Sequence, residues 1–213
     1  MPDSSSYGEA FGERLHARAT SLVARSLQNG LLAVTEIRSD NPQCGLSSSL
    51  VREDAFLVAL QLRDYPIHEY WEDGRPVPVT ALRAGDTTMY DIKRDPVFRI
   101  NNPFHSIHFY FPRAALNVIA DNAQAPNIDE LRYQPGAGVD DRVMRGLTQS
   151  LLPTFEHPEQ ANRLFVEQVT LAVGVHAAST YGGMKAEQRT ARGGLAPWQE
   201  KRAIEILDAN LDG

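Results

Sequence analysis

Short runs of alternating apolar and polar residues occupy the first half of the chain. The runs that predict β-strands are Leu31–Arg38, Ala55–Arg63, Ile67–Glu72, Pro76–Leu82, Thr87–Lys93, Val97–Ile100 and Ser106–Phe111. Turn-forming residues such as Asp73-Gly74 and Gly85-Asp86 separate them. Alternation with a period of two is typical of half-buried strands. Because no helical run interrupts the series, the pattern favours an antiparallel sandwich or barrel over a parallel sheet.

Helical spacing of apolar residues flanks this region on both sides. It predicts one helix before the strands, over Arg14–Leu27, ended by Asn29-Gly30. Three more are predicted behind the strands: Arg113–Asp121, then Val139–Leu152 ended at Pro153, then Glu159–Tyr181 ended at Gly182-Gly183. A polar linker and a further helix from Ala196 follow. The predicted fold class is α+β, with an antiparallel barrel followed by a helical segment.

The predicted helix Glu159–Tyr181 is apolar over most of its circumference. A helix that packs on one core needs only an apolar stripe about 100° wide. Complete burial inside one domain explains the excess, and so does contact with a second copy of the chain, which we favour because two-fold dimers are the commonest oligomers. Gly174 allows close approach of another backbone. The residues expected at the dimer contact are Leu164, Gln168, Leu171, Ala172 and Val175.

Composition narrows the class of protein. The chain has 213 residues, 42% apolar and 23% charged, within the globular range. Lys and Arg total 21 against 27 Asp and Glu, a net charge of −6, so binding of nucleic acid by phosphate neutralisation is not expected of most of the chain. Its single cysteine, Cys44, cannot form an internal disulfide. No apolar window is long enough to span a membrane, and the first 20 residues do not resemble a secretion signal. We expect a cytoplasmic protein.

The sequence carries no recognisable catalytic motif. It lacks G-x-S-x-G and a Gly-rich phosphate loop, and Cys44 has no neighbouring histidine. His105 and His108 are the only close pair of histidines, and a separation of three along a strand places them on opposite faces. His68-Glu69 meets the same objection. We therefore expect no metal, no cofactor and no enzymatic activity.

A small-molecule pocket is a better use of the predicted barrel. One face of Ala55–Gln61 carries the smaller side chains, which leave room for a ligand, whereas the other face is bulky. Sites of this kind are mostly apolar with a few polar groups. The candidate lining residues are Ala59, Gln61, His68, Tyr70, Trp71, Tyr90, Arg99, His108 and Tyr110. Arg99 is the only cation among them, so an anionic ligand is expected to use it. The alternative for each is an amphipathic side chain at the surface.

The C-terminal residues carry a family resemblance. Leu195-Ala196-Pro197-Trp198-Gln199, with Arg202, Ile206 and Asn210-Leu211, resembles the opening helix of the AraC-type DNA-binding domain. Segments 104–116, 136–141 and 158–183 resemble the sensor half of such regulators, and the turn Gly85-Asp86 is similar to one in cupins. The resemblance implies a cupin-like effector-binding and dimerisation domain over 1–181, a linker over 182–195, and the first helix of a helix-turn-helix domain over 196–213.

What the resemblance implies for function is a dimeric transcriptional regulator that binds a small effector inside its barrel. The family's two helix-turn-helix units lie beyond the first helix, so this chain holds no recognition helix and no DNA-contacting residue is assigned. DNA is expected to be contacted only through that missing C-terminal domain. A stand-alone cupin enzyme, an isomerase or a metal-dependent oxygenase, is the alternative. The lack of a histidine pair on one strand face speaks against it.

Overall fold

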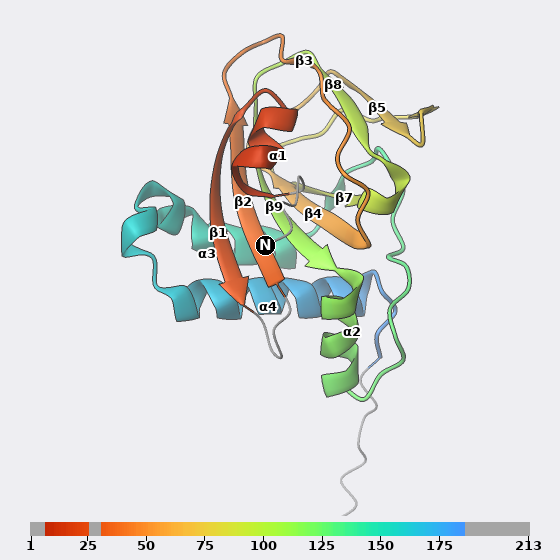
Figure 1. Ribbon diagram of the computed structural model, residues 1–213, viewed down its shortest axis with the longest axis vertical. Coiled ribbons are helices and arrows are strands. Elements are labelled where there is room, and N and C mark those ends of the chain that lie inside the picture. Colours follow the sequence, from red (N-terminus) through yellow and green to blue (C-terminus); the bar gives the residue numbers. More distant parts are fainter. Residues whose placement is uncertain (1–6, 26–30, 186–213) are drawn as a thin grey trace, which may run out of the picture.

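The computed structural model describes residues 7–25 and 31–185, which form two antiparallel sheets and a set of helices (Figure 1). The strands are β1 (Arg18–Arg25), β2 (Leu31–Ser39), β3 (Gly45–Leu46), β4 (Ala55–Gln61), β5 (His68–Glu72), β6 (Arg75–Val77), β7 (Asp86–Asp91), β8 (Val97–Ile100), β9 (Phe104–Pro112) and β10 (Val139–Asp140). The helices are α1 (Gly8–Arg14), α2 (Arg113–Asn122), α3 (Arg142–Glu156) and α4 (Arg163–Thr180), with 3₁₀ turns η2 (Ile92–Arg94) and η3 (Pro158–Gln160).

The strand order shows the type of barrel. The larger sheet has the order β1-β2-β9-β4-β7-β10 and the smaller sheet β3-β8-β5-β6, with every pairing antiparallel. Without the outer strands β1 and β10, the eight strands from β2 to β9 pair as a jelly roll, the double-sheet architecture of cupins. The predicted α+β class with a cupin-like antiparallel barrel followed by helices is therefore confirmed.

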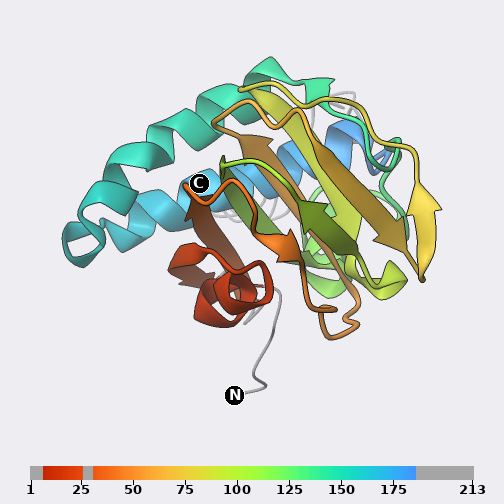
Figure 2. The same cartoon turned by 90° about the horizontal axis from the view of Figure 1, so that it is seen from above.

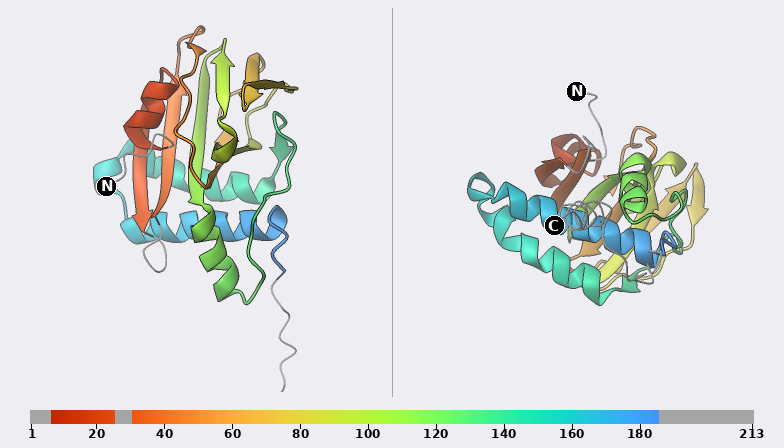
Figure 3. Two further views of the ribbon diagram at one scale, coloured as in Figure 1. Left: turned by 45° about the vertical axis from the view of Figure 1, so that its right-hand side comes forward. Right: turned by 90° about the horizontal axis from the view of Figure 1, so that it is seen from below.

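The larger sheet is buried on both faces. One face, which includes Leu57 and Ala59, packs with α1 and the smaller sheet around the barrel interior. The other face, which includes Phe56 and Val58, packs against α2, α3 and α4. Figure 2 shows α3 and α4 running side by side across this second face, and Figure 3 shows the same pair from two further directions. Burial on both faces explains why all seven residues of β4 are buried.

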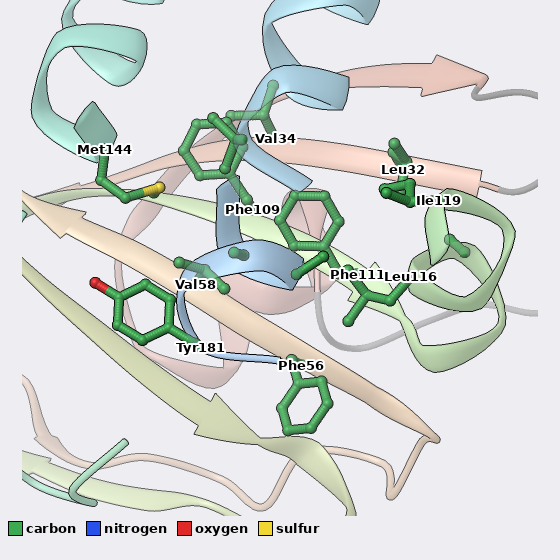
Figure 4. Packing of buried hydrophobic residues seen from close by; sticks show 14 of the residues in the cluster. Leu32, Val34, Phe56, Val58, Phe109, Phe111, Leu116, Ile119, Met144 and Tyr181 are labelled. Atoms are coloured by element: carbon green, nitrogen blue, oxygen red, sulfur yellow. The ribbon is translucent and has the colours of Figure 1, made fainter. Parts of the chain in front are cut away.

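The helix-side core is aromatic and closely packed. Phe56, Val58, Phe109 and Phe111 project from the sheet toward the helices, where they meet residues such as Leu116 (Figure 4). The two rings from β9 stack at 6.3 Å between centroids.

A glycine sets the distance between α4 and this core. A Cβ added at Gly174 would lie 2.9 Å from Ile119 Cδ1 and 3.0 Å from Phe111 Cε1. The groups that come close to Gly174 are therefore side chains and not the backbone that the sequence led us to expect, and the missing Cβ lets the helix lie directly on the aromatic layer.

Three predicted helices differ from the structure. The one expected over Glu159–Tyr181 begins instead at Arg163, after the 3₁₀ turn η3. The helix expected over Arg14–Leu27 is wrong, because α1 ends at Arg14 and the following residues form β1. β1 pairs with β2 along its whole length, and sheet partners outweigh weak local helical spacing. The helix expected over Val139–Leu152 begins instead at Arg142, because Val139 and Asp140 pair with β7 and Asp141 caps the helix.

Proline does not end α3. Pro153 lies inside the helix, which continues to Glu156. A proline removes one backbone hydrogen bond and crowds the carbonyl four residues earlier. Both effects fall in the last turn and near Gln149, which is exposed to solvent, so the helix tolerates them.

The described residues bear only in part on the predicted domain boundaries. They cover most of the expected barrel and dimerisation domain, whereas all but residues 182–185 of the linker and the whole expected helix over 196–213 lie outside them. Within the described residues, no helix has the length and apolar character needed to cross a bilayer.

Candidate ligand site in the barrel interior

A small cavity lies between the two sheets of the barrel. Its volume is about 30 Å³, room for a water molecule or two. Both sheets and the segment after α1 contribute to its wall: Leu15, Gln61, Tyr65, Tyr90, Phe98, Ile100, Phe104, Ser106 and His108. The wall is mainly apolar and aromatic with a few polar groups, as in small-molecule sites.

Most of the predicted lining residues face this interior. Gln61, Tyr90 and His108 line the cavity directly. His68 stacks on the lining residue Tyr65 with ring centroids 4.6 Å apart. Ala59 and the aromatic residues Tyr70 and Tyr110 belong to the same interior cluster, with Ala59 paired to His108 across β4 and β9. The small face of β4 therefore points into the barrel, as its pattern predicted.

Trp71 and Arg99 do not belong to this site. On β5 and β8 the side chains of Tyr70 and Phe98 point inward, so their neighbours Trp71 and Arg99 point outward. Arg99 is exposed, and its Nη1 lies 3.6 Å from Glu69 Oε1. Its guanidinium carbon lies over the Trp71 ring, 5.9 Å from the ring centroid. The prediction that Arg99 holds an anionic ligand inside the barrel is wrong for this reason.

The interior polar groups are neutral and incompletely paired. The Ser106 hydroxyl and His108 Nε2 share a 2.9 Å hydrogen bond, and the Phe11 ring packs edge-on against the imidazole at 5.1 Å. Burial lowers the pKa of His108 to about 3 and that of His68 to about 4, so both rings are uncharged at neutral pH. Within the described residues, the Nδ1 atoms of both histidines are buried without a hydrogen-bond partner.

Unpaired buried polar atoms are unfavourable, because each loses its hydrogen bonds to water without replacement. Thr88, opposite Ala59 on an inward-facing position of β7, adds its hydroxyl to the polar groups of the interior, next to Tyr90. Water or the polar groups of a ligand would satisfy the two Nδ1 atoms. The arrangement can therefore bind a small neutral molecule through hydrogen bonds and aromatic contacts.

The histidines fall into a different grouping from the one the sequence suggested. His105 and His108 lie on opposite faces of β9, as predicted: His105 meets Glu36 at 2.8 Å on the helix side of the sheet. His68 and His108, however, both face the interior. This pair was not predicted, because only histidines close in the sequence were considered as pairs. The alternation on β5 and β9 was the signal that could have found it. Among the described residues, no three His, Cys, Asp or Glu side chains gather around one point that could hold a metal ion.

The helix α4 carries the residues that were predicted to form a dimer contact, and one side of it is exposed. Val166, Val169, Val173 and Ala177 are buried against the sheet side. On the opposite side, Leu164 is 64% exposed and Val175 40% exposed. Of the other predicted dimer residues, Gln168 is exposed and Leu171 and Ala172 are half-buried. The apolar circumference of α4 is thus only partly covered within one copy of the described chain.

The fold and the cavity together define a cupin-type jelly roll with a helical layer on one face. No protein-family profile matches the chain. A curated relative, the "Uncharacterized protein in nit 5'region" of Bacillus sp. (strain OxB-1), is 28% identical over 159 residues, which are 72% of this chain and 58% of that protein. The chain thus spans less than two thirds of the length of this relative.

Solved structures that resemble the chain share little sequence with it. A Cupin 2 conserved barrel domain protein from Salinispora arenicola is 13% identical, with 51% of this chain and 86% of that chain covered and a TM-score of 0.34. The AraC-like transcriptional activator CuxR is 10% identical, with 95% of this chain and 73% of that chain covered and a TM-score of 0.46.

Proposed function

We propose that this chain is the effector-sensing and dimerising part of a cytoplasmic, AraC-type transcriptional regulator and that it is not an enzyme. The observation that carries the proposal is the uncharged barrel interior, in which buried Nδ1 atoms of His68 and His108 have no partner among the described residues. The resemblance of the segment after residue 194 to an AraC-type helix supports the regulatory role.

The effector class follows from the wall of the cavity. No charged side chain lines it, and both interior histidines are neutral at physiological pH. A charged effector would lose its hydration there without an opposite charge in return. We therefore propose a small neutral effector with an apolar or aromatic body and one or two hydrogen-bonding groups.

Such an effector needs more room than 30 Å³. Leu15 closes one side of the cavity, and it follows the short helix α1, whose Phe11 covers His108. Movement of these two side chains would enlarge the cavity without breaking a strand pairing, so we place the entrance there.

A thermal-shift screen tests the effector proposal. Neutral sugars, aromatic alcohols and amides are compared with aromatic and fatty carboxylates, because a ligand that binds only the folded protein raises the Tm. We expect a neutral compound to raise the Tm of the wild type and to lose this effect in His108→Phe. The control is His157→Gln, at an exposed position directly after the last residue of α3. Stabilisation by carboxylates alone, or equal stabilisation of His108→Phe, would refute the interior site.

The exposed side of α4 supports the homodimer. Leu164 and Val175 lie exposed on α4, whereas Leu171 is half-buried and packs in part against the chain's own core. Val175→Glu is expected to convert a dimer to a folded monomer, because a charge in a desolvated contact costs several kcal/mol. Sedimentation velocity with circular dichroism checks both statements, with Gln149→Glu as a control at an exposed polar position of α3. A wild type that is monomeric at tens of micromolar, an order-of-magnitude range for standard interfaces, contradicts the proposal.

We place DNA contact in a helix-turn-helix domain beyond this chain. The net charge of −6 and the absence of a recognition helix from the sequence both weigh against DNA binding by the chain itself. An electrophoretic shift assay at low salt is expected to show no sequence-specific binding. A specific shift that resists added salt would overturn this assignment.

The second candidate is a stand-alone cupin enzyme that uses a metal. It is favoured by one observation, that His68 and His108 both face the barrel interior. Elemental analysis of purified protein separates the candidates. A stoichiometric metal that is lost in His108→Ala supports the enzyme, and its absence in wild-type protein prepared with added Zn²⁺, Fe²⁺ and Mn²⁺ supports the sensor.

A further inference from the structure

A second, larger cavity lies outside the barrel interior, at the end of the smaller sheet. Its volume is about 480 Å³, within the range of small-molecule sites. Glu72, Asp73, Arg75, Val77 and Arg94 line it, and none of these residues lines the interior cavity. The β5–β6 hairpin forms one wall, and a 2.6 Å hydrogen bond from the Asp73 backbone N–H to the Arg94 carbonyl ties the hairpin to η2.

The register of the hairpin gathers the side chains of this cavity on one face. Glu72 pairs with Arg75, and Tyr70 pairs with Val77, so these four residues share the face that continues from the barrel interior. The Tyr70 hydroxyl donates a 2.7 Å hydrogen bond to Glu72 Oε1. Because the Glu72 side chain is only 11% exposed, this bond holds its carboxylate in place.

The two guanidinium groups retain unused donors. The ion pairs of Arg94 are long: its Nη1 lies 3.4 Å from Glu72 Oε2, and its Nε lies 3.5 Å from Asp91 Oδ2. Arg75 is exposed and makes no ion pair with any other described residue. A guanidinium presents five N–H donors in a fork that fits a carboxylate. The cavity therefore has donor capacity that the chain itself does not use.

A buried hydroxyl lies next to the same charges. The Tyr133 oxygen is buried, and Glu72 and Arg94 are among the charged groups near it. Burial, with the nearby negative charges of Glu72 and Asp91, raises the pKa of Tyr133, so the group stays an O–H donor.

We propose that this cavity, which we name the hairpin cavity, binds a small hydroxycarboxylate. The carboxylate lies between Arg75 and Arg94, and the hydroxyl beside it donates to Glu72, whose carboxylate is 3.4 Å from Arg94. Val77 supplies an apolar contact for the carbon chain. A dianion such as phosphate is disfavoured, because Glu72 and Asp73 add negative charge to the wall. The hairpin cavity is distinct from the interior effector site and does not depend on it.

The test compares lactate with propionate, which lacks the hydroxyl, and with inorganic phosphate. Each is titrated into ¹⁵N-labelled full chain at constant ionic strength, and amide shifts are followed. We expect saturable amide shifts of residues 72–75 and 77, with half-saturation on the order of millimolar and binding several-fold tighter for lactate than for propionate. Arg75→Gln is expected to weaken lactate about tenfold, because it removes a charge-assisted hydrogen-bond pair. Arg99→Gln, an exposed arginine on the adjacent strand, is the control and is expected to bind as the wild type does.

Five results would overturn the proposal. The first is the absence of a saturable shift with lactate. The second is equal affinity of lactate and propionate, and the third is tighter binding of phosphate than of lactate. The fourth is shifts confined to residues 106–110 of the barrel interior, and the fifth is unchanged binding of lactate by Arg75→Gln. Because Arg75 is exposed, its substitution is expected to leave the fold intact, and the amide spectrum of each variant verifies this.

Discussion

Replacement of Arg113 should test how the helical layer is joined to the barrel. Arg113 is the first residue of α2, yet it is only 5% exposed. Its Nη2 donates a hydrogen bond to Asp91 Oδ2 and its Nη1 donates one to Asp54 Oδ1, both at 2.9 Å. Its Nε donates a third hydrogen bond, at 2.7 Å, to the Asp129 carbonyl oxygen. It also stands over the Phe56 ring at 4.0 Å.

The magnitude follows from what Arg113→Met would leave behind. Asp91, whose side chain is 3% exposed, would lose its bidentate partner and keep the Lys93 backbone N–H at 3.0 Å and Arg94 at 3.5 Å. Breaking a buried ion pair from one side costs about 3–5 kcal/mol. Loss of a desolvated cation–π contact is worth up to about 2 kcal/mol on its own and overlaps with this figure. We therefore expect Arg113→Met to lower the free energy of unfolding by about 3–5 kcal/mol, a large share of the roughly 5–15 kcal/mol that stabilises a domain.

Arg99→Met is the matched control. Arg99 also has a carboxylate partner and a tryptophan ring beneath it, but it is exposed. Exposed pairs contribute about 0–1 kcal/mol, so this variant should unfold close to the wild type. Urea unfolding followed by circular dichroism measures both, and an unchanged m-value shows that the comparison is valid.

A double variant guards against complete unfolding of Arg113→Met. Asp91→Asn in the same chain removes the buried charge, so Arg113→Met/Asp91→Asn should be more stable than Arg113→Met alone. The reasoning is refuted if Arg113→Met costs no more than Arg99→Met, or if Asp91→Asn makes Arg113→Met still less stable.

Three further predictions concern the barrel and its turns. The folded-state pKa of His108, about 3, lies below its ordinary value of 6.5, so its contribution to stability is complete above pH 6.5 and is lost as the pH falls toward 3. Between pH 7 and 5 this should cost about 2 kcal/mol by urea unfolding. His108→Gln should remove this part of the pH dependence and leave the part that comes from His68, whereas the exposed His157→Gln should leave the profile unchanged. Ala59→Phe should cost about 1–3 kcal/mol, because only about 30 Å³ of the interior is free; a stability equal to wild type would contradict this. Gly146 in α3 has open space around it, so Gly146→Ala should raise the free energy of unfolding by up to about 1 kcal/mol. Gly136→Ala should lower the free energy of unfolding, because Gly136 has φ +76° and its new Cβ would lie 2.3 Å from the Pro78 carbonyl oxygen. Effects of the same sign at both positions would contradict this prediction.

The alternating pattern of residues 55–61 was sufficient to predict a strand and its two faces, and the smaller face, which was the candidate for the ligand side, points into the barrel. Such patterns are readable because side chains alternate along a strand whatever lies around it. The same rule placed His105 and His108 on opposite faces of β9, as found. The α+β class and the trailing helices followed in the same way, from the change of period at Pro112.

Other features depended on contacts between distant residues. Residues 18–25 form a strand because β2 lies beside them, which local helical spacing could not reveal. The inward direction of β5 and β8 was decided by their place in the smaller sheet, and it removed Trp71 and Arg99 from the interior. Facing sheets brought His68 to the same interior as His108, and a hairpin tied to η2 brought Arg75 to the same cavity as Arg94. A sequence determines the period of each element by itself, but the neighbour that each face meets is set only when the sheets close on one another.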